Sequence, residues 1–168
     1  AYFGLEKEVD IQLGTLSKSL GSVGGYVAGN STIIDYLVNT SRSFIFSTAL
    51  SPADIGAALA ALHILESDVS VLRRLHENVN YMADQLISMG INATNETPIF
   101  PILIGRNEDT LAVSNYLYEA GIIGTAIRPP TVPIGESRIR LTVTAAHNKE
   151  QIDYVCQSLH NAMKQLES

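Results

Sequence analysis

The surroundings of Lys18 suggest the most specific chemistry in this sequence. Lys18 follows an apolar, β-rich run at residues 9–14 and a short polar turn that contains Thr15 and Ser17, and a glycine-rich stretch extends beyond it to Gly25. A strand before the lysine can fix the position of its amine, and the two hydroxyls can donate hydrogen bonds to a phosphate. Glycines let the backbone approach a flat ring closely. The pattern therefore predicts a lysine that forms a Schiff base with a flat, phosphate-bearing cofactor.

Two other interpretations of the glycines fail on spacing. A P-loop requires glycine at the positions that Gln12 and Ser17 occupy. A dinucleotide-binding loop requires Gly-x-Gly-x-x-Gly at the start of a helix, and that spacing does not occur here. We therefore interpret Gly21, Gly24 and Gly25 as residues that allow the chain to turn tightly beside the cofactor.

Arg128 and Arg140 are the candidate anion-binding residues. A guanidinium group suits carboxylates because two parallel hydrogen bonds fix the plane of the bound group. Arg128 begins the motif Arg-Pro-Pro-Thr-Val-Pro, and Arg140 is the second arginine of an Arg-Ile-Arg motif. Arg138 and Arg140 alternate along a predicted strand, so they share one face of it. We expect Arg138 to form an ion pair at the surface or at a domain interface.

Four segments resemble, in the same order, motifs of the α-oxoamine synthases, a family of pyridoxal-phosphate enzymes of fold type I. They are the Lys18 segment, residues 43–52, residues 126–133 and residues 138–147, which together span nearly the whole chain. Family members condense an amino acid with an acyl thioester and release carbon dioxide. The resemblance implies pyridoxal 5′-phosphate as the cofactor. It also implies that Lys18 first holds the cofactor and then acts as the general base at the substrate Cα.

The resemblance assigns further residues to the cofactor phosphate. Thr15, and less clearly Ser17, would donate hydroxyls to it; the alternative is that both hydroxyls only cap the turn. Ser47 and Thr48 resemble a pair that family dimers donate to the neighbouring subunit's cofactor, which implies a homodimer with a shared active site. The alternative for this pair is an N-cap, but Ser51 fits that position better because a proline follows it.

The resemblance also concerns the substrates. Arg140 would bind the amino-acid carboxylate, and Arg128 would lie at the substrate entrance, near the acyl chain or the carboxylate. The motifs Arg-Pro-Pro-Thr-Val-Pro and Thr-Ala-Ala-His are most similar to those of family members that use L-alanine and a pimeloyl thioester. Two alternatives stay open: an enzyme that uses glycine and acetyl-CoA, or a non-catalytic fragment that binds the cofactor weakly or not at all.

Composition narrows the function classes. The chain has 168 residues, of which 46% are hydrophobic, and a formal net charge of −6. It is apolar enough to form a core, and it has no basic stripe that would bind nucleic acid. We see no signal peptide and no apolar span long enough for a membrane, and Cys156 is the single cysteine. A reduced, cytoplasmic setting is therefore the simplest expectation. The four histidines do not have metal-ligand spacing, and we expect structural roles for them, His147 in a turn.

The periodicity of apolar residues predicts a compact α/β arrangement. A buried strand at 9–14, a second strand at 25–28 and a third at 44–46 are expected in the first part. A helix is expected from Ser31, as its N-cap, to residue 38, and a well-buried helix is expected at residues 53–66. A further helix should end near Met89, with Gly90 as its C-terminal stop. Later strands are expected at 99–104, 122–127 and 139–143, and helices at 109–120 and 149–166.

We expect two parts: residues 1–70 as the C-terminal end of a large cofactor-binding domain, and residues 71–168 as a small C-terminal α/β domain. The chain begins in mid-pattern, and family members are more than twice as long. We therefore interpret it as the C-terminal part of a larger enzyme. The aspartate that contacts the pyridine nitrogen and the histidine that stacks on the ring in this family have no counterpart among these residues.

Overall fold

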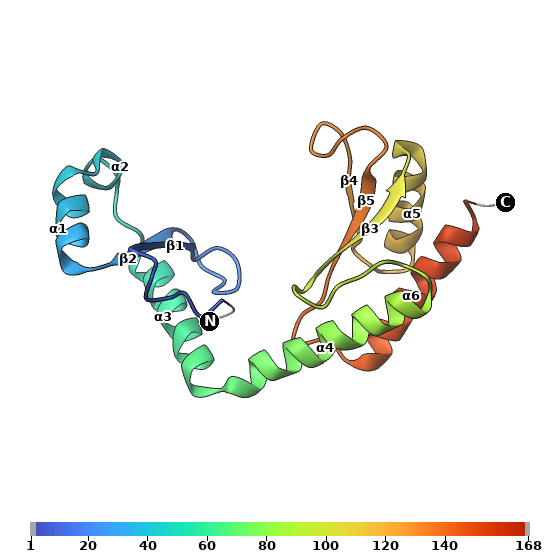
Figure 1. Ribbon diagram of the computed structural model, residues 1–168, viewed down its shortest axis with the longest axis horizontal. Coiled ribbons are helices and arrows are strands. Elements are labelled where there is room, and N and C mark those ends of the chain that lie inside the picture. Colours follow the sequence, from blue (N-terminus) through green and yellow to red (C-terminus); the bar gives the residue numbers. More distant parts are fainter. Residues whose placement is uncertain (1–2, 167–168) are drawn as a thin grey trace. The chain divides into compact units, whose positions relative to one another are not determined.

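The computed structural model describes residues 3–166. It consists of two compact units that meet in sequence between Asp68 and Val69, unit 1 (1–68) and unit 2 (69–168). The division we expected from the sequence lies two residues further along the chain, after residue 70. Figure 1 shows unit 1 from blue to green and unit 2 from green to red.

Unit 1 begins with a β-hairpin. Strands β1 (Ile11–Thr15) and β2 (Gly25–Gly29) pair antiparallel, with Gly14 opposite Tyr26. The connection between them, residues 16–24, contains Lys18. Gly21 and Gly24 have φ angles of +59° and +102°, which L side chains rarely adopt. The hairpin loop therefore needs its glycines, as the sequence indicated.

Three helices follow in unit 1: α1 (Ser31–Thr40), α2 (Arg42–Ile45) and α3 (Pro52–Ser67). The N-cap of α1 is Asn30 and not Ser31, because the Asn30 side chain accepts a hydrogen bond from the Ile33 amide at 2.9 Å. Ser51 caps α3 as expected, with a proline as the first helical residue. Good local caps thus define where these helices begin.

The strand expected at residues 44–46 is wrong. The amides of Phe44 and Ile45 both donate to the Ser41 carbonyl, at 3.0 and 2.9 Å, and so form the short helix α2. Three apolar residues are too few for periodicity to separate a strand from a helical turn. No described strand lies beside this segment, so the local helical hydrogen bonds prevail.

The burial expected in unit 1 is also wrong. Strand β1 is present, but its side chains are exposed or partly exposed, and Leu13 keeps 81% of its surface accessible. Helix α3 carries apolar residues around its whole circumference, yet Ala58 is its one buried residue. The sequence pattern correctly indicates surfaces suited to burial, but nothing in the described chain covers them.

Unit 2 contains a three-stranded antiparallel sheet and three helices. The strands are β3 (Ile99–Gly105), β4 (Thr125–Ile127) and β5 (Ser137–Thr142), in the order β3-β5-β4. Helices α4 (Val69–Ser88), α5 (Asn107–Glu119) and α6 (Lys149–Lys164) contribute to one core with the sheet. The α/β architecture is thus as expected, and Gly90, with a φ of +77°, follows the end of α4.

Strand β4 is shorter than expected. The Ile122 amide donates to the Leu117 carbonyl at 2.8 Å, so residue 122 completes the end of α5 rather than starting a strand. Ser114 also donates its hydroxyl to the Gly124 carbonyl at 2.6 Å. The backbone between α5 and β4 therefore forms hydrogen bonds with the end of α5, and pairing with β5 begins only at Thr125.

The two faces of this sheet differ. Ile139 and Leu141 of β5 point into the core together with Phe100 and Ile102 of β3. The intervening residues of β5 point away from the core, because side chains alternate along a strand. They include Arg138 and Arg140, so the sheet that anchors the core also presents both arginines on its opposite face.

Residues 3–166 contain six helices, of which α4 is the longest at 20 residues. No single helix there is long and apolar enough to cross a membrane, although α3 and α4 meet the length and composition criteria together as a bent pair.

Candidate functional site

Lys18 lies in a hydrogen-bonded turn within the loop between β1 and β2. The Gly21 amide donates to the Lys18 carbonyl at 3.0 Å, and the Ser22 amide donates to the Leu16 carbonyl at 2.9 Å. A further bond joins the Leu16 amide to the Gly24 carbonyl at 2.9 Å. The Lys18 side chain is exposed and forms no hydrogen bond or ion pair with any described residue. The backbone of the turn is therefore held by hydrogen bonds, while the side chain of Lys18 has no polar partner among the described residues.

The hydroxyls of Thr15 and Ser17 lie together beside this lysine. Their oxygens are 2.7 Å apart, and the Ser17 amide donates to the Thr15 hydroxyl oxygen at 3.1 Å. These bonds match the capping role that was the alternative in the sequence. The two roles are compatible, because both hydroxyls are exposed and one hydroxyl proton can turn toward a bound anion.

These residues fit the phosphate end and the lysine attachment of pyridoxal phosphate. A paired, exposed hydroxyl site lies three residues before an exposed primary amine that has no partner in the described chain. Gly14 and Gly25 also keep this part of the hairpin thin. A Cβ at Gly14 would meet the Tyr26 ring at 2.5 Å, and one at Gly25 would meet the Gly14 carbonyl oxygen at 2.9 Å.

Ser22 was not singled out in the sequence and makes a contact that the sequence does not reveal. Its hydroxyl donates to the Asp54 carbonyl in the first turn of α3, at 2.6 Å. The partners are 32 positions apart, so only the folded unit brings them together. The one signal in the sequence is a hydroxyl residue within a glycine-rich run.

Ser47 and Thr48 lie in the exposed segment between α2 and α3. The Ser47 hydroxyl donates to the Ser43 carbonyl, which ends the turn of α2. Thr48 forms no side-chain hydrogen bond with the described residues. Neither residue caps α3, because Ser51 does so. The capping alternative for this pair is therefore excluded, and its role toward a neighbouring subunit stays a prediction.

Arg138 and Arg140 share a face of β5 but differ in their partners. Arg138 donates from Nε to the Glu136 carbonyl and from Nη2 to the Glu136 carboxylate, both at 2.9 Å. Arg140 lies between Pro101 of β3 and Thr125 of β4 and is exposed. No described side chain pairs with it. Of the two arginines, Arg140 is therefore the one whose guanidinium is available for a carboxylate.

Arg128 directly follows β4 and begins the loop that leads to β5. The Thr131 amide donates to the Arg128 carbonyl at 3.0 Å, and the loop contains a cis peptide between Pro129 and Pro130. The guanidinium has no partner among residues 3–166. Arg140 thus lies on β5 and Arg128 in the loop after the neighbouring strand β4, both in unit 2, whereas the predicted cofactor-binding residues belong to unit 1.

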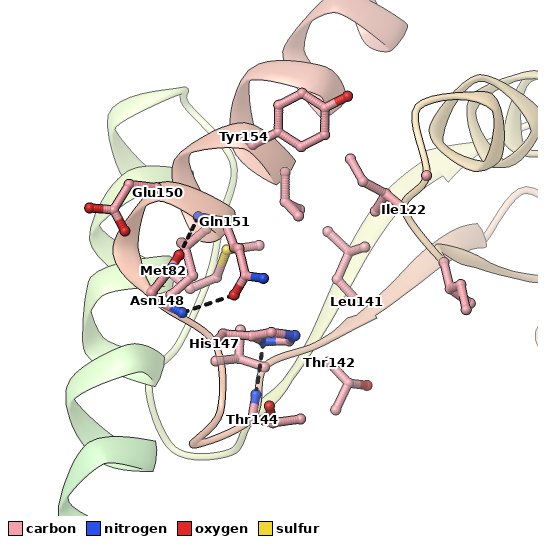
Figure 2. A pocket seen from close by; sticks show the side chains of 15 residues that line it. Met82, Ile122, Leu141, Thr142, Thr144, His147, Asn148, Glu150, Gln151 and Tyr154 are labelled. Atoms are coloured by element: carbon pink, nitrogen blue, oxygen red, sulfur yellow. Dashed lines mark hydrogen bonds between the residues drawn. The ribbon is translucent and has the colours of Figure 1, made fainter.

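His147 forms the turn between β5 and α6, the role expected for it. Its Nδ1 accepts a hydrogen bond from the Thr144 amide at 3.2 Å, and Asn78 of α4 donates to the carbonyls of Thr144 and His147 at 3.0 and 2.7 Å. Figure 2 shows this turn at the edge of a cleft of about 640 Å³ that Leu141 and Ile122 also line. Asn148 and Gln151 form a capping box at the start of α6. The polar groups of the cleft therefore serve mainly to hold the turn and helix.

Other titratable groups in unit 2 have structural surroundings. Burial raises the pKa of the Cys156 thiol to about 11, and its Sγ lies 3.5 Å from the Met82 sulfur. The hydrogen bond from the Tyr81 hydroxyl to Asp153, at 2.7 Å, raises the pKa of that tyrosine. Arg106 holds the pKa of Asp109 below its usual value through a hydrogen bond at the start of α5. Within the described part of the chain, no group of His, Cys, Asp or Glu could hold a metal ion.

Comparison with known families decides the classification. The family described as aminotransferase class I and II matches residues 1–159. The chain belongs to this family. The match covers unit 1, most of unit 2 and all four segments on which the resemblance rests.

Individual relatives narrow the classification to the α-oxoamine synthases. An 8-amino-7-oxononanoate synthase from Thermoanaerobacter pseudethanolicus is 42% identical over 98% of this chain, which corresponds to 42% of that protein. The structure of an 8-amino-7-oxononanoate synthase from Francisella tularensis aligns with a TM-score of 0.78 and 25% identity, over 94% of this chain and 45% of that one. The expected family is therefore confirmed.

A third relative bears on the fold and cofactor. A serine palmitoyltransferase variant from S. paucimobilis with a bound PLP–myriocin aldimine aligns with a TM-score of 0.91 and 26% identity, over 98% of this chain and 42% of that one. The fold-type I class and the family's pyridoxal-phosphate cofactor are confirmed. This chain spans about two fifths of the length of the relatives it matches, which agrees with the expectation that it corresponds to part of a larger enzyme.

Proposed function

We propose that the complete protein is a pyridoxal-phosphate acyltransferase that condenses L-alanine with a pimeloyl thioester. The product would be 8-amino-7-oxononanoate, with release of carbon dioxide. The observation that carries this proposal is the Lys18 loop, with an unpaired amine beside two adjoining hydroxyls. It occurs in a chain whose relatives at about 40% identity are named 8-amino-7-oxononanoate synthase.

The residues of unit 1 would bind the cofactor and move a proton. Pyridoxal phosphate, when bound, supplies an electron-withdrawing ring that stabilises negative charge at the substrate Cα. Lys18 Nζ would attach the cofactor and, once the amino acid has taken its place, accept the Cα proton. Thr15 and Ser17 would donate hydrogen bonds to the phosphate oxygens and so hold the cofactor while Lys18 is detached.

The residues of unit 2 would orient the amino acid. A bidentate guanidinium on a strand can hold a carboxylate in one plane, which a lysine ammonium cannot do. Arg140 is suited to this role because its guanidinium is exposed and unpaired, whereas Glu136 occupies Arg138. Arg128, on the adjoining loop, would contact the acyl substrate or the same carboxylate at the entrance.

Covalent labelling of Lys18 tests the proposal. Borohydride reduction of the complete enzyme with bound pyridoxal phosphate should fix the cofactor to Lys18, as peptide mapping would show. Lys18→Ala should abolish turnover and retain the fold, because the side chain is exposed and forms no hydrogen bond or ion pair with a described residue. Lys7→Ala is the matched control, since Lys7 is also an exposed lysine of unit 1 and should not affect turnover. Labelling of Lys7, Lys149 or Lys164 instead would overturn the assignment.

Product analysis tests the choice of substrates. With L-alanine and a pimeloyl thioester the enzyme should form 8-amino-7-oxononanoate, and with glycine and acetyl-CoA it should be much less active. The reverse preference would assign it to the 2-amino-3-ketobutyrate-forming branch. An enzyme that binds the cofactor at Lys18 but turns over neither pair would not be the proposed synthase.

We also propose that the complete enzyme is a homodimer in which Ser47 and Thr48 reach the partner's cofactor phosphate. The exposed position of both residues and the absence of a capping role at α3 support this proposal. Thr48→Val should weaken cofactor binding, and Thr40→Val is a control because the Thr40 hydroxyl bonds its own helix, at the Tyr36 carbonyl. Sedimentation analysis that finds a fully active monomer would rule the shared site out.

A further inference from the structure

The hydrogen bond between Ser22 and Asp54 attaches the Lys18 loop to helix α3. The Ser22 hydroxyl is partly buried and donates to the Asp54 carbonyl at 2.6 Å, a short distance for this kind of bond. Asp54 lies in the first turn of α3, and its amide and carboxylate both bond the Ser51 cap, at 3.2 and 2.6 Å. The acceptor is therefore part of a well-ordered helix start.

The position of Ser22 lets this bond control the turn that carries Lys18. Ser22 donates its amide to the Leu16 carbonyl at 2.9 Å, which closes residues 17–21 into a small turn. The bond between Gly21 and Lys18 closes this turn further. Ser22 is thus at the base of the turn, and its hydroxyl is the group that joins this base to α3.

Apolar contacts between the loop and α3 do not fix the turn equally well. Leu16 and Leu20 of the loop and Ile55 and Leu59 of α3 line an open hollow of about 450 Å³. Apolar contacts of this kind are non-directional, so they hold the loop near the helix without fixing the orientation of the turn. Leu50 approaches Gly24 closely, since a Cβ there would lie 2.8 Å from a Leu50 methyl. The hydrogen bond supplies the directional contact that these apolar groups lack.

The same helix start also follows the segment that contains Ser47 and Thr48. Ser51, the cap of α3, is three residues beyond Thr48, and the Ser22 bond ends one turn further along the helix. Both groups of predicted phosphate ligands in unit 1 are therefore tied to the first turn of α3, one through the chain and the other through Ser22.

We propose that Ser22 is a positioning residue for Lys18. Through its bond to the Asp54 carbonyl it holds the base of the Lys18 turn on α3, so that the amine and the Thr15–Ser17 hydroxyl pair keep the spacing that the cofactor requires. Ser22 itself touches no reacting atom. The inference rests on the proposed function, because it needs pyridoxal phosphate attached to Lys18.

Three variants of the complete enzyme test this role. Ser22→Ala removes the bond, Ser22→Thr keeps a hydroxyl at the same position, and Ser67→Ala is the matched control. Ser67 also donates a serine hydroxyl to a backbone carbonyl of α3, that of His63 at 2.7 Å, but at the other end of the helix. Both alanine variants lose a serine hydroxyl that donates to a carbonyl of α3, but the Ser67 bonds are exposed and lie within the helix, whereas the Ser22 bond is partly buried and joins two elements. The thermal midpoint is therefore expected to fall more in Ser22→Ala, and cofactor binding is the property that the two variants compare.

Cofactor binding separates positioning from stability. Ser22→Ala should raise the dissociation constant of pyridoxal 5′-phosphate about fivefold, the effect expected from one neutral hydrogen bond. It should also change the pH profile of the visible absorbance of the lysine-bound cofactor. Ser22→Thr should restore both properties, and Ser67→Ala should change neither. Unchanged binding and absorbance in Ser22→Ala, or equal losses in Ser67→Ala, would overturn the positioning role.

The failure of this inference can be distinguished from that of the proposed function. If the unmodified enzyme attaches the cofactor to Lys18 and Ser22→Ala behaves like it, only the positioning role is wrong. If the unmodified enzyme does not attach pyridoxal phosphate at Lys18, the proposed function fails, and the role of Ser22 fails with it.

Discussion

The two units of this chain have similar fractions of apolar residues, but unit 2 buries them and unit 1 leaves them exposed. In unit 2, buried residues from three helices and from strands β3 and β5 form one continuous core, and Leu86, Leu117 and Ile139 are completely buried. In unit 1, Ala58 is the one buried hydrophobic residue among those described, and Leu13, Phe3 and Phe46 are about four-fifths exposed. Soluble proteins rarely leave so much apolar surface uncovered. Unit 2 therefore has the features of a self-sufficient fold, and unit 1 those of a surface that needs a partner.

This difference relates to the distribution of the chemistry. The candidate lysine and phosphate ligands lie in unit 1, whereas the candidate carboxylate ligand lies on a strand that is anchored in the core of unit 2. We infer that the remaining part of the complete enzyme covers the apolar face of unit 1 and thereby excludes water from Lys18. Arg140, in contrast, obtains its rigid support from within this chain.

The largest expected effect concerns the two units expressed separately. Residues 69–168 should unfold in a single cooperative thermal transition, because their core is complete. Residues 1–68 should show no cooperative transition and should associate through exposed apolar side chains. Calorimetry and sedimentation of the two fragments would measure this. A cooperative, monomeric fragment 1–68 would show that the contrast between the units is wrong.

The second effect is the cost of removing one leucine side chain from each unit. Leu86→Ala should lower the free energy of unfolding by about 2–5 kcal/mol, since Leu86 is fully buried in the core of unit 2. Leu13→Ala should change the cooperative transition of this chain, which reports on unit 2, by less than about 0.5 kcal/mol, because Leu13 is exposed and lies in unit 1. Denaturant titration gives both values.

The same pair of variants also tests the inference that another part of the complete enzyme covers the apolar face of unit 1. In the complete enzyme Leu13→Ala should become destabilising, if another part of the protein buries this side chain. An effect of Leu13→Ala that is equally small in the complete enzyme would leave the exposed face of β1 without the proposed partner.

The third effect compares two arginines on one strand of unit 2. Arg140→Ala should weaken amino-acid binding by a factor on the order of 30, which corresponds to the lower end of the 2–5 kcal/mol typical of a charge-assisted pair. Arg140→Lys should restore the charge but not the orientation, so turnover should stay low. Arg138→Ala is the matched control, because Glu136 already pairs with Arg138.

Affinity and stability together decide the role of Arg140. If it serves only a structural ion pair between domains, Arg140→Ala will lower the thermal midpoint and leave the alanine dissociation constant unchanged. The reverse result, weaker binding at an unchanged midpoint, is expected from its exposed and unpaired guanidinium.

The sequence predicts the elements of this fold better than their surroundings. Gly90, Ser51 and the helices of unit 2 follow from local rules for caps and periodicity, and these rules hold in the structure. The strand expected at residues 44–46 fails because a three-residue apolar run carries no decisive period. The expected burial of β1 and α3 fails because it depends on what lies against them, which their own residues do not determine.

The candidate site shows the same limit. Lys18, Thr15 and Arg140 can be found in the sequence because their types and spacing form motifs. The pairing of Arg138 with Glu136 and the bond from Ser22 to Asp54 cannot, since they depend on side-chain directions and on a contact across 32 positions. Motifs thus indicate candidate reacting groups, and only the folded chain shows which neighbours form hydrogen bonds with them or with the loop that carries them.

The last expected effect, absent near neutral pH, is a pH dependence that reports on unit 2 alone. Cys156 is the one cysteine of the chain and is buried in α6, so its reaction with an alkylating reagent measures the opening of unit 2 and not of unit 1. Burial raises its pKa from 9.0 to about 11. Between these values the unfolded chain releases the thiol proton and the folded chain keeps it. Stability should therefore be unaffected by this group below about pH 9 and decline as the pH rises toward 11.

Two measurements check the assignment of this decline to the thiol. Cys156→Ala should remove the part of the stability loss that occurs between pH 9 and 11. At pH 8, alkylation of the native chain should be much slower than that of the unfolded chain, because only the thiolate reacts and burial disfavours it. Rapid native alkylation at pH 8 would mean that α6 opens readily. In that case unit 2 would lack the well-packed core that distinguishes it from unit 1, and the comparison between the two units would have to be abandoned.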